Sequence, residues 1–260
     1  KEVLDAVHAA GGRLILQLMH AGMNVFMPEK HVAGGKLLAP SGGMKAPNEM
    51  ETTEITAADR EKIRNDFVDA AKAAQEMGFD GIQLHCAHGY LLSQFLDPNT
   101  NHRTDEFGGD IYGRMFMHLE ILKKVRAIVG PDYPLFARIS AEEFVLGGNT
   151  IVQSRIFAQE LVKHGIDCMD VSAGVRFDDA PVKGYSDQRG KPTIEYPDGP
   201  NVYLAEEIKK CVDVPVVTVG KLGNPEFADN VIAEGRADMV ALARPLIADP
   251  MWVRKAKDHR

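Results

Sequence analysis

The stretch GFDGIQLHCAHGYLLSQF, residues 78–95, decides how the rest of the chain is interpreted. Residues 78–84 form a short, mostly apolar run, which is typical of a strand buried in a parallel sheet. Two imidazoles and a phenol follow within six residues, at His85, His88 and Tyr90. Neutral histidine can donate a hydrogen bond, and tyrosine stays protonated at neutral pH. The cluster therefore predicts a site that polarises a carbonyl and supplies a proton. In the structural alternative, one histidine caps a loop and the other is a core residue with its hydrogen bonds satisfied.

Strand-like and helix-like segments alternate along the whole chain. Strands are expected at 13–19, 81–86, 134–140, 168–174, 214–220 and 239–243, and helices at 55–78, 111–130, 150–165, 201–212 and 224–235. This alternation implies a parallel α/β sheet with right-handed crossovers. No G-x-G-x-x-G follows the first strand, so the usual mark of an open dinucleotide-binding sheet is missing. Polar residues gather after the strands, which favours a TIM (β/α)8 barrel.

The number of units indicates an incomplete barrel. About six strand–helix units can be counted, against the eight of a closed barrel. Residues 1–11 already have the spacing of the end of a helix, which Gly11 and Gly12 stop. We therefore expect residues 1–260 to be one domain that lacks upstream sequence.

Composition narrows the class of protein. A net charge of -7 without a Lys/Arg block argues against a nucleic-acid surface. No apolar stretch reaches the roughly 18 residues of a membrane span. The three cysteines are odd in number and far apart, which suits a reducing cytoplasm and offers no metal-ligand spacing. We expect a cytoplasmic enzyme acting on a small molecule, with no metal, nucleic-acid or membrane partner.

The loops after the last two expected strands carry glycine and basic residues. Gly220 and Lys221 follow one strand, and Ala243 and Arg244 follow the next. Such loops commonly bind phosphate in barrels, through backbone N–H groups and helix amino termini. The pattern predicts a phosphate-bearing ligand, with simple tight turns as the alternative.

Two polar side chains interrupt otherwise apolar strands. Gln17 lies in LILQLM and Arg138 in LFARIS. A buried amide or guanidinium is costly without partners. Arg138 can be structural, paired with a carboxylate such as Glu142, or both side chains can bind a heterocycle such as a flavin ring.

Four stretches together resemble the old yellow enzyme family of FMN-dependent NADH:flavin oxidoreductases. They are most similar to its enoate reductase and 2,4-dienoyl-CoA reductase branch, which includes bile-acid-inducible oxidoreductases. The stretches are LQLMHAG (16–22), GFDGIQLHCAHGYLLSQFLDPNTNHRTDEFGG (78–109), FARIS (136–140) and ALARPLIADP (241–250). Met23 and Ala243 depart from the family pattern, which usually has arginine and glycine there.

The resemblance implies a role for each candidate residue. Gln17 and Arg138 would contact the flavin ring, and His85 and His88 would bind the substrate carbonyl oxygen, with Tyr90 as proton donor. The FMN phosphate would be held by four residues, Gly220, Lys221, Ala243 and Arg244. NADH or NADPH would donate the electrons.

The resemblance also implies that residues 13–19 are the third barrel strand. The chain would then represent strands three to eight, truncated at the amino end and, on one interpretation, at the carboxyl end as well. A 4Fe-4S cluster and FAD would belong only to a longer parent chain.

Three hypotheses follow from the sequence. The first is reduction of the C=C bond of an α,β-unsaturated carbonyl compound of enoate or enoyl type. The second is a phosphate-handling lyase or isomerase in which His85 and His88 act as acid–base groups or metal ligands. The third is a barrel fragment that binds flavin poorly, with open strand edges that pair with other chains into homo-oligomers.

Overall fold

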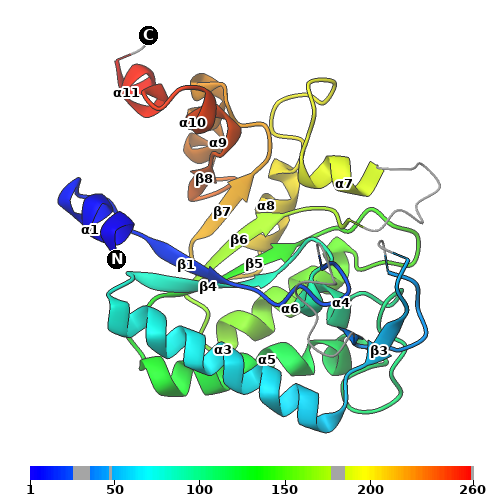
Figure 1. The fold of residues 1–260 in the computed structure, drawn as a ribbon. Helices are drawn as coiled ribbons and strands as arrows, with labels where there is room; N and C mark the ends of the chain where they lie inside the picture. The colour runs from blue at the N-terminus through cyan, green and yellow to red at the C-terminus, as the bar shows by residue number, and fades with distance from the viewer. Residues whose placement is uncertain (26–35, 47–48, 177–184, 259–260) are drawn as a thin grey trace.

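A curled, all-parallel sheet of six strands forms the centre of the molecule (Figure 1). The computed structural model describes residues 1–25, 36–46, 49–176 and 185–258. In sheet order the strands are β1 (Ile15–Leu18), β4 (Gly81–Cys86), β5 (Leu135–Ser140), β6 (Cys168–Ser172), β7 (Val216–Val219) and β8 (Met239–Ala241). This sheet confirms the predicted α/β class and the six strands that the alternation indicated.

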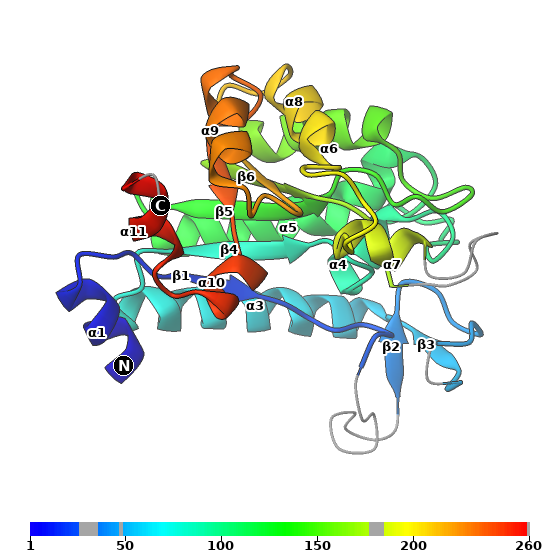
Figure 2. The same cartoon turned by 90° about the horizontal axis from the view of Figure 1, so that it is seen from above.

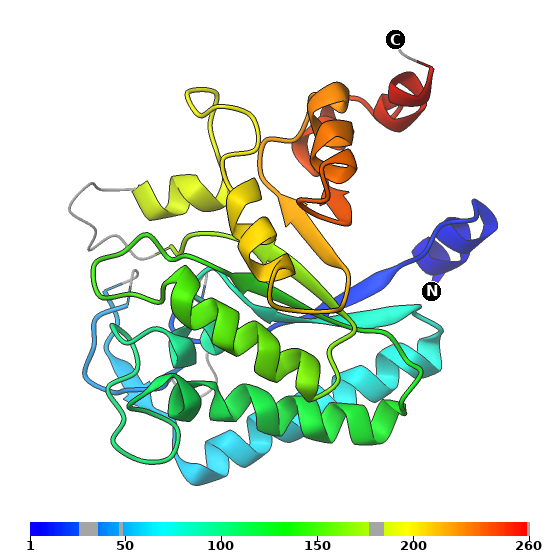
Figure 3. The same ribbon diagram turned by 180° about the vertical axis from the view of Figure 1, so that it is seen from behind.

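A row of helices covers one side of the sheet, as the view from behind shows (Figure 3). The row runs α3, α5, α6, α8, each helix in contact with the next. The helices are α1 (Glu2–Ala9), α3 (Ala57–Met77), α4 (Leu91–Leu96), α5 (Ile111–Val129), α6 (Ile151–Lys163), α7 (Tyr185–Gly190), α8 (Val202–Lys209), α9 (Pro225–Ala233), α10 (Arg244–Ala248) and α11 (Trp252–Lys257). In the part of the chain that the structure describes, none is long and apolar enough to cross a bilayer.

Local sequence explains where the long helices begin and end. Thr56 and Asp59 form a capping box at the start of α3. Gly78 ends the helix with a φ of 90°, a left-handed conformation that glycine adopts without steric cost. Asp110 caps α5 by accepting a hydrogen bond from the Gly113 amide at 3.0 Å.

Strand alternation divides the side chains of the sheet between two faces. On one face Ile82, Leu84, Ala137 and Ile139 are buried in the main core, which includes residues of α3, α5 and α6. The other face carries polar residues in matching register, since Gln17 lies beside Gln83, His85 beside Arg138, and Arg138 beside Asp170. The helices therefore cover the apolar face and leave the polar face for a site.

An aspartate precedes every second strand at the amino ends of the sheet. Asp80 accepts a hydrogen bond from the Leu14 amide at 2.8 Å. Asp167 accepts one from the Leu135 amide at 2.8 Å, and Asp238 accepts one from the Val216 amide at 2.9 Å. Each carboxylate also contacts a basic side chain, respectively His8, Arg126 and Lys209. These three aspartates, here called the amino-end aspartates, join neighbouring strands where they begin.

Several short elements lie in the loops between the strands and helices that the sequence predicted. The glycine- and proline-rich region 21–53 contains most of a parallel pair of strands, β2 (Leu37–Ala39) and β3 (Thr52–Glu54). Figure 2 shows this pair standing apart from the main sheet. Helices α4, α7 and α10 were not predicted either, because five or six residues are too few to show helical periodicity. Residues 26–35 and 177–184 of these loops lie outside the described part of the chain.

Candidate active site

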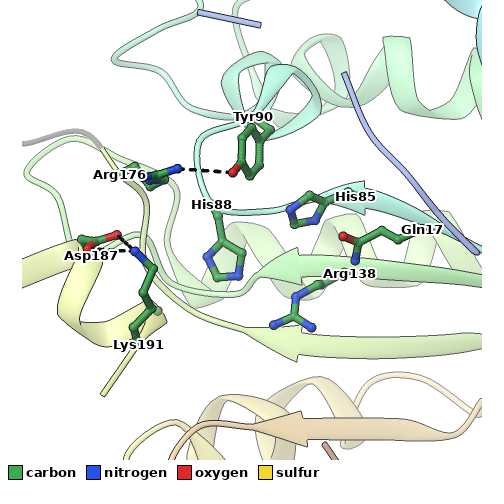
Figure 4. Close-up of a pocket in the computed structure, with 9 residues that line it drawn as sticks. Gln17, His85, His88, Tyr90, Arg138, Arg176, Asp187 and Lys191 are labelled. Atoms are coloured by element: carbon green, nitrogen blue, oxygen red, sulfur yellow. Dashed lines mark hydrogen bonds and ion pairs between the residues drawn. The ribbon is translucent and has the colours of Figure 1, made fainter. Parts of the chain in front are cut away.

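A pocket of about 320 Å³ opens at the carboxyl ends of β4 and β5. Figure 4 shows its lining side chains converging from several elements. The structure brings together five of the predicted site residues and adds four others. The lining consists of Gln17, His85, His88, Tyr90, Arg138, Arg176, Asp187, Gly190 and Lys191.

His85 is the last polar residue on β4 and is only 5% exposed. Its Nδ1 is buried and has no hydrogen-bond partner. Its ring lies 5.7 Å from the His88 ring and 5.1 Å from the Tyr90 ring, measured between centroids. Burial, helped by the charge of Arg138, lowers the pKa of His85 to about 4. The imidazole is therefore neutral near pH 7 and keeps one N–H to donate.

The backbone conformation of His88 and two contacts hold the residue in place. Its φ is +60°, a left-handed conformation that is uncommon outside glycine. Its amide donates to Ser140 Oγ at 2.9 Å, and its Nδ1 lies 3.2 Å from the Gly174 carbonyl oxygen. Burial, with smaller contributions from Arg138 and His85, lowers the pKa of His88 to about 3. This second imidazole is also neutral, and its position is fixed.

Tyr90 faces the same pocket from the start of α4. Arg176 Nη1 donates to its phenolic oxygen at 3.4 Å. Because a guanidinium has only donors, the proton of Tyr90 points away from Arg176. Arg176 was missed by the sequence analysis, since it lies in a polar loop with no distinguishing pattern.

A chain of hydrogen bonds crosses four strands behind the pocket. Gln17 Nε2 donates to Gln83 Oε1 at 2.6 Å, and Gln83 Nε2 donates to Asp170 Oδ2 at 3.0 Å. Arg138 Nη1 donates to the same Asp170 oxygen at 2.9 Å. Burial raises the pKa of Asp170, and the positive charge of Arg138 acts against that rise. We call these four residues the inner-face chain.

The partner of Arg138 corrects the sequence-based suggestion. Arg138 pairs with Asp170, whereas the Glu142 carboxylate accepts the Ile151 amide at 2.8 Å at the start of α6. Gln83 and Asp170 were missed, although both are polar residues within apolar strands, the same signal that identified Gln17 and Arg138. Which carboxylate meets Arg138 depends on sheet register, which the sequence does not reveal.

Helix α7 covers the pocket near His88. A Cβ added at Gly190 would lie 3.3 Å from His88 Nδ1 and 3.0 Å from the Ala173 carbonyl oxygen. Asp187 of this helix pairs with Lys191, the residue that follows the helix, at 2.9 Å. Glycine at position 190 therefore allows the helix to approach the histidine closely.

A buried carboxyl pair lies next to the site. Asp97 follows α4, and Glu143 follows β5. The two carboxyl groups interact with each other, and the Asn149 amide donates to Glu143 Oε2 at 2.6 Å. Burial raises the pKa of Asp97 to about 6 and raises that of Glu143 well above its usual range. Burial of the two groups side by side therefore favours the protonated form of the pair.

Comparison with known proteins identifies the family. A profile of the NADH:flavin oxidoreductase / NADH oxidase family matches residues 1–260. The chain belongs to this family. It is the FMN-dependent family, also called old yellow enzymes, that the sequence motifs resemble, so that resemblance is confirmed.

Individual members of the flavin oxidoreductase family support the match. An NADH oxidase from Thermoanaerobacter brockii is 43% identical over 263 residues, covering 100% of this chain and 38% of the relative. An NADPH dehydrogenase from Halalkalibacterium halodurans is 34% identical, covering 98% and 69%. A structure of 2-naphthoyl-CoA reductase with 2-naphthoyl-CoA has a TM-score of 0.91 at 29% identity, covering 100% and 40%. The chain spans less than two-fifths of the length of the first curated relatives it matches.

The pocket fits the cofactor of the flavin oxidoreductase family. Two polar side chains of its lining, the amide of Gln17 and the guanidinium of Arg138, are held by hydrogen bonds from behind and reach the pocket. A flavin ring has both donors and acceptors to offer, so the residues present suit it. By contrast, no group of three or more His, Cys, Asp or Glu side chains able to hold a metal occurs within residues 1–25, 36–46, 49–176 and 185–258.

The four residues predicted to hold the FMN phosphate lie after β7 and β8, apart from the pocket lining. Lys221 donates to the carbonyl oxygens of Ile194 and Tyr196, and its amine lies 3.8 Å from Asp198 Oδ1. Ala243 and Arg244 are exposed at the start of α10. The two loops adjoin each other, because a Cβ on Gly223 would lie 3.1 Å from Pro245 Cγ. Phosphate binding by Gly220, Lys221, Ala243 and Arg244 stays a prediction.

Proposed function

We propose that this protein reduces the C=C bond of an α,β-unsaturated carbonyl compound, using FMN and NADH or NADPH. The observation that carries the proposal is the convergence of two neutral imidazoles, a phenol and the flavin-suited pair Gln17 and Arg138 on one pocket. FMN, when bound, supplies hydride transfer, which no side chain can perform. The remaining steps belong to the chain itself.

His85 and His88 bind the substrate carbonyl oxygen. Hydrogen-bond donors directed at a developing negative charge stabilise it most where water is excluded. His85 is buried with an unpaired ring nitrogen, and His88 is fixed beside it. Because both pKa values are well below 7, the rings act as neutral donors and do not transfer their protons.

Tyr90 supplies the proton that completes the reduction. Its ring lies 5.1 Å from that of His85, so substrate held by the histidines is close to the phenol. Arg176 occupies one side of the phenolic oxygen as a donor, which leaves the hydroxyl proton directed elsewhere.

Gln17 and Arg138 are the residues that would contact the flavin ring, and Gly220, Lys221, Ala243 and Arg244 would hold its phosphate. The fixed positive charge of Arg138 favours negative charge on a ring bound beside it.

The alternative of a lyase or isomerase finds no support among the relatives, which are named as oxidoreductases. The absorbance spectrum of the purified protein after incubation with FMN and desalting tests the proposal. We expect a bound-flavin band, and oxidation of NADH or NADPH that depends on 2-cyclohexen-1-one or crotonate. Absence of bound flavin would overturn the proposal; bound flavin with no alkene reduction would overturn the substrate class.

A further inference from the structure

We propose that Asp170 is a positioning residue that aligns both flavin-facing side chains, Arg138 directly and Gln17 through Gln83. This inference rests on the proposed function, because it assigns a role towards the flavin ring. The side chain of Asp170 is absent from the pocket lining and lies behind it.

The geometry begins with one carboxylate oxygen. Asp170 Oδ2 accepts from Arg138 at 2.9 Å and from Gln83 at 3.0 Å. The side chain of Asp170 is 8% exposed, while that of Arg138 is 23% exposed and reaches the pocket. The buried Asp170 carboxylate therefore fixes the position of the Arg138 side chain, and Arg138 is the residue of the pair that can contact a ligand.

The carboxylate also sets the direction of two amides. A carboxylate only accepts hydrogen bonds, so Gln83 must turn its NH₂ group towards Asp170. The Gln83 carbonyl oxygen then faces Gln17 and accepts from its Nε2 at 2.6 Å. The carbonyl oxygen of Gln17 is left for the pocket, as Figure 4 shows. Asp170 thus determines which group Gln17, three strands away in the sheet, presents to a ligand.

The negative charge of Asp170 adds an electrostatic effect. A carboxylate beside the Arg138 guanidinium offsets part of its positive charge. Any negative charge on a ring bound at Arg138 is stabilised less than it would be by an unpaired arginine. Asp170 therefore acts on both the affinity for the flavin and the potential of the bound flavin.

The chain offers a matched control on the same two strands. Asp167 pairs with Arg126 at 2.6 Å and accepts the Leu135 amide, at the amino ends of β5 and β6. It resembles Asp170 in residue type and in having an arginine partner, but it lies at the end of the sheet opposite the pocket. Asp167→Asn tests the loss of a paired aspartate without touching the site.

The experiment compares Asp170→Leu, Asp170→Asn and Asp167→Asn. The apoproteins are titrated with FMN by fluorescence quenching, and the flavin midpoint potential is measured by dye equilibration. Asp170→Leu should weaken FMN binding at least tenfold, because it removes the carboxylate that accepts hydrogen bonds from Arg138 and Gln83. Asp170→Asn keeps an acceptor but loses the charge, so binding should change less than threefold while the potential shifts in the positive direction. Asp167→Asn should change neither quantity.

A double variant shows whether Asp170 acts through Arg138. In an Arg138→Leu background, Asp170→Asn should move the potential by less than half as much, because only the path through Gln83 and Gln17 remains. A shift of undiminished size there would overturn the inference. Unchanged FMN binding in Asp170→Leu, or an unmoved potential in Asp170→Asn, would also overturn it. If Asp170→Leu fails to fold, the flavin midpoint potential of Asp170→Asn alone tests the inference. A wild-type protein that binds no FMN would instead overturn the proposed function.

Discussion

The two ends of the same sheet use similar side chains in opposite ways. At the amino ends, each of Asp80, Asp167 and Asp238 accepts a backbone N–H and contacts a basic residue. At the carboxyl ends, His85 Nδ1 and Asp170 Oδ1 are buried without a partner. Partnered groups stabilise a fold, whereas buried unpaired groups remain available to a ligand. The comparison supports the proposal that the amino ends stabilise the fold and the carboxyl ends bind the ligand, the division of roles found in TIM barrels.

The pKa values of the carboxyl groups follow the same division. A backbone amide and His8 lower the pKa of Asp80, and Lys209 with a backbone amide lowers that of Asp238. Burial raises the pKa values of Asp97 and Asp170 at the other end. At the amino ends, hydrogen-bond and charged partners determine the direction of the carboxyl pKa shifts. At the carboxyl ends, loss of hydration on burial determines it.

The largest expected effect comes from removing both histidines of the carboxyl ends. His85→Ala with His88→Ala should lower turnover of an α,β-unsaturated ketone by roughly 10³-fold or more, because one such donor typically contributes roughly 10²–10³. FMN content should stay near that of the wild type. Steady-state kinetics and the flavin-to-protein absorbance ratio measure these quantities. Unchanged turnover would contradict the role given to this end of the sheet.

Tyr90→Phe should affect only one of the two half-reactions proposed at the carboxyl ends of the sheet. The variant loses the proton donor but little volume, so reduction of the alkene should slow by roughly 10²-fold, within the range of general acid catalysis. Reduction of the flavin by NADPH should keep the wild-type rate, since that step needs no proton from Tyr90. Stopped-flow absorbance follows each half-reaction separately. Equal slowing of both would identify Tyr90 as a structural residue.

The pH dependence of stability should have opposite signs at the two ends. The raised pKa of Asp97 makes the folded state bind its proton more tightly, so stability falls as pH rises from about 4 to about 6, by about 2–3 kcal/mol. The lowered pKa of Asp238 stabilises the fold above about pH 4 and is lost as the solution becomes more acidic.

Urea unfolding between pH 3 and pH 7 checks both signs. Asp97→Asn should reduce the decline between pH 4 and pH 6, leaving the part due to Glu143 and Asp170. Asp238→Asn should reduce the loss below about pH 4, leaving the part due to other carboxylates such as Asp80. A wild-type stability that rises between pH 4 and pH 6, with Asp97→Asn behaving identically, would contradict the assignment at the carboxyl ends.

The smallest effect should come from one amino-end aspartate. Asp238→Ala leaves the amide of the fully buried Val216 without its partner, which should lower the free energy of unfolding by about 1–2 kcal/mol. The exposed pair with Lys209 adds little. FMN content and turnover should not change. Asp213→Ala, an exposed aspartate before β7, is the matched control and should change stability by less than about 0.5 kcal/mol.

Features that depend on near neighbours in the chain were predictable from the sequence. The helix expected at 55–78 agrees with α3 (Ala57–Met77), because its ends are set by capping residues three or four positions apart. The cluster of His85, His88 and Tyr90 was found for the same reason, since one strand end and its loop hold all three. Their shared pocket confirms the expected grouping, while their roles stay predictions.

Features that depend on distant residues were not predictable. Asp170 meets Arg138 across 32 positions of sequence, and only the register of β5 and β6 selects it over Glu142. Arg176 meets Tyr90 across 86 positions. Gly190 lies in a polar loop with no periodicity, and its need for a small side chain appears only when α7 is packed on His88.

One carbonyl group couples the pocket to the loop after β6. The Gly174 oxygen accepts from Ser140 Oγ at 2.7 Å and lies 3.2 Å from His88 Nδ1. A neutral imidazole carries a single ring proton, so His88 can donate either to Gly174 or, from Nε2, to a ligand oxygen. When the proton moves from Nδ1 to Nε2, the Gly174 carbonyl still accepts a hydrogen bond from Ser140 Oγ. A ligand oxygen at His88 Nε2 and the Gly174 carbonyl at Nδ1 therefore compete for one ring proton.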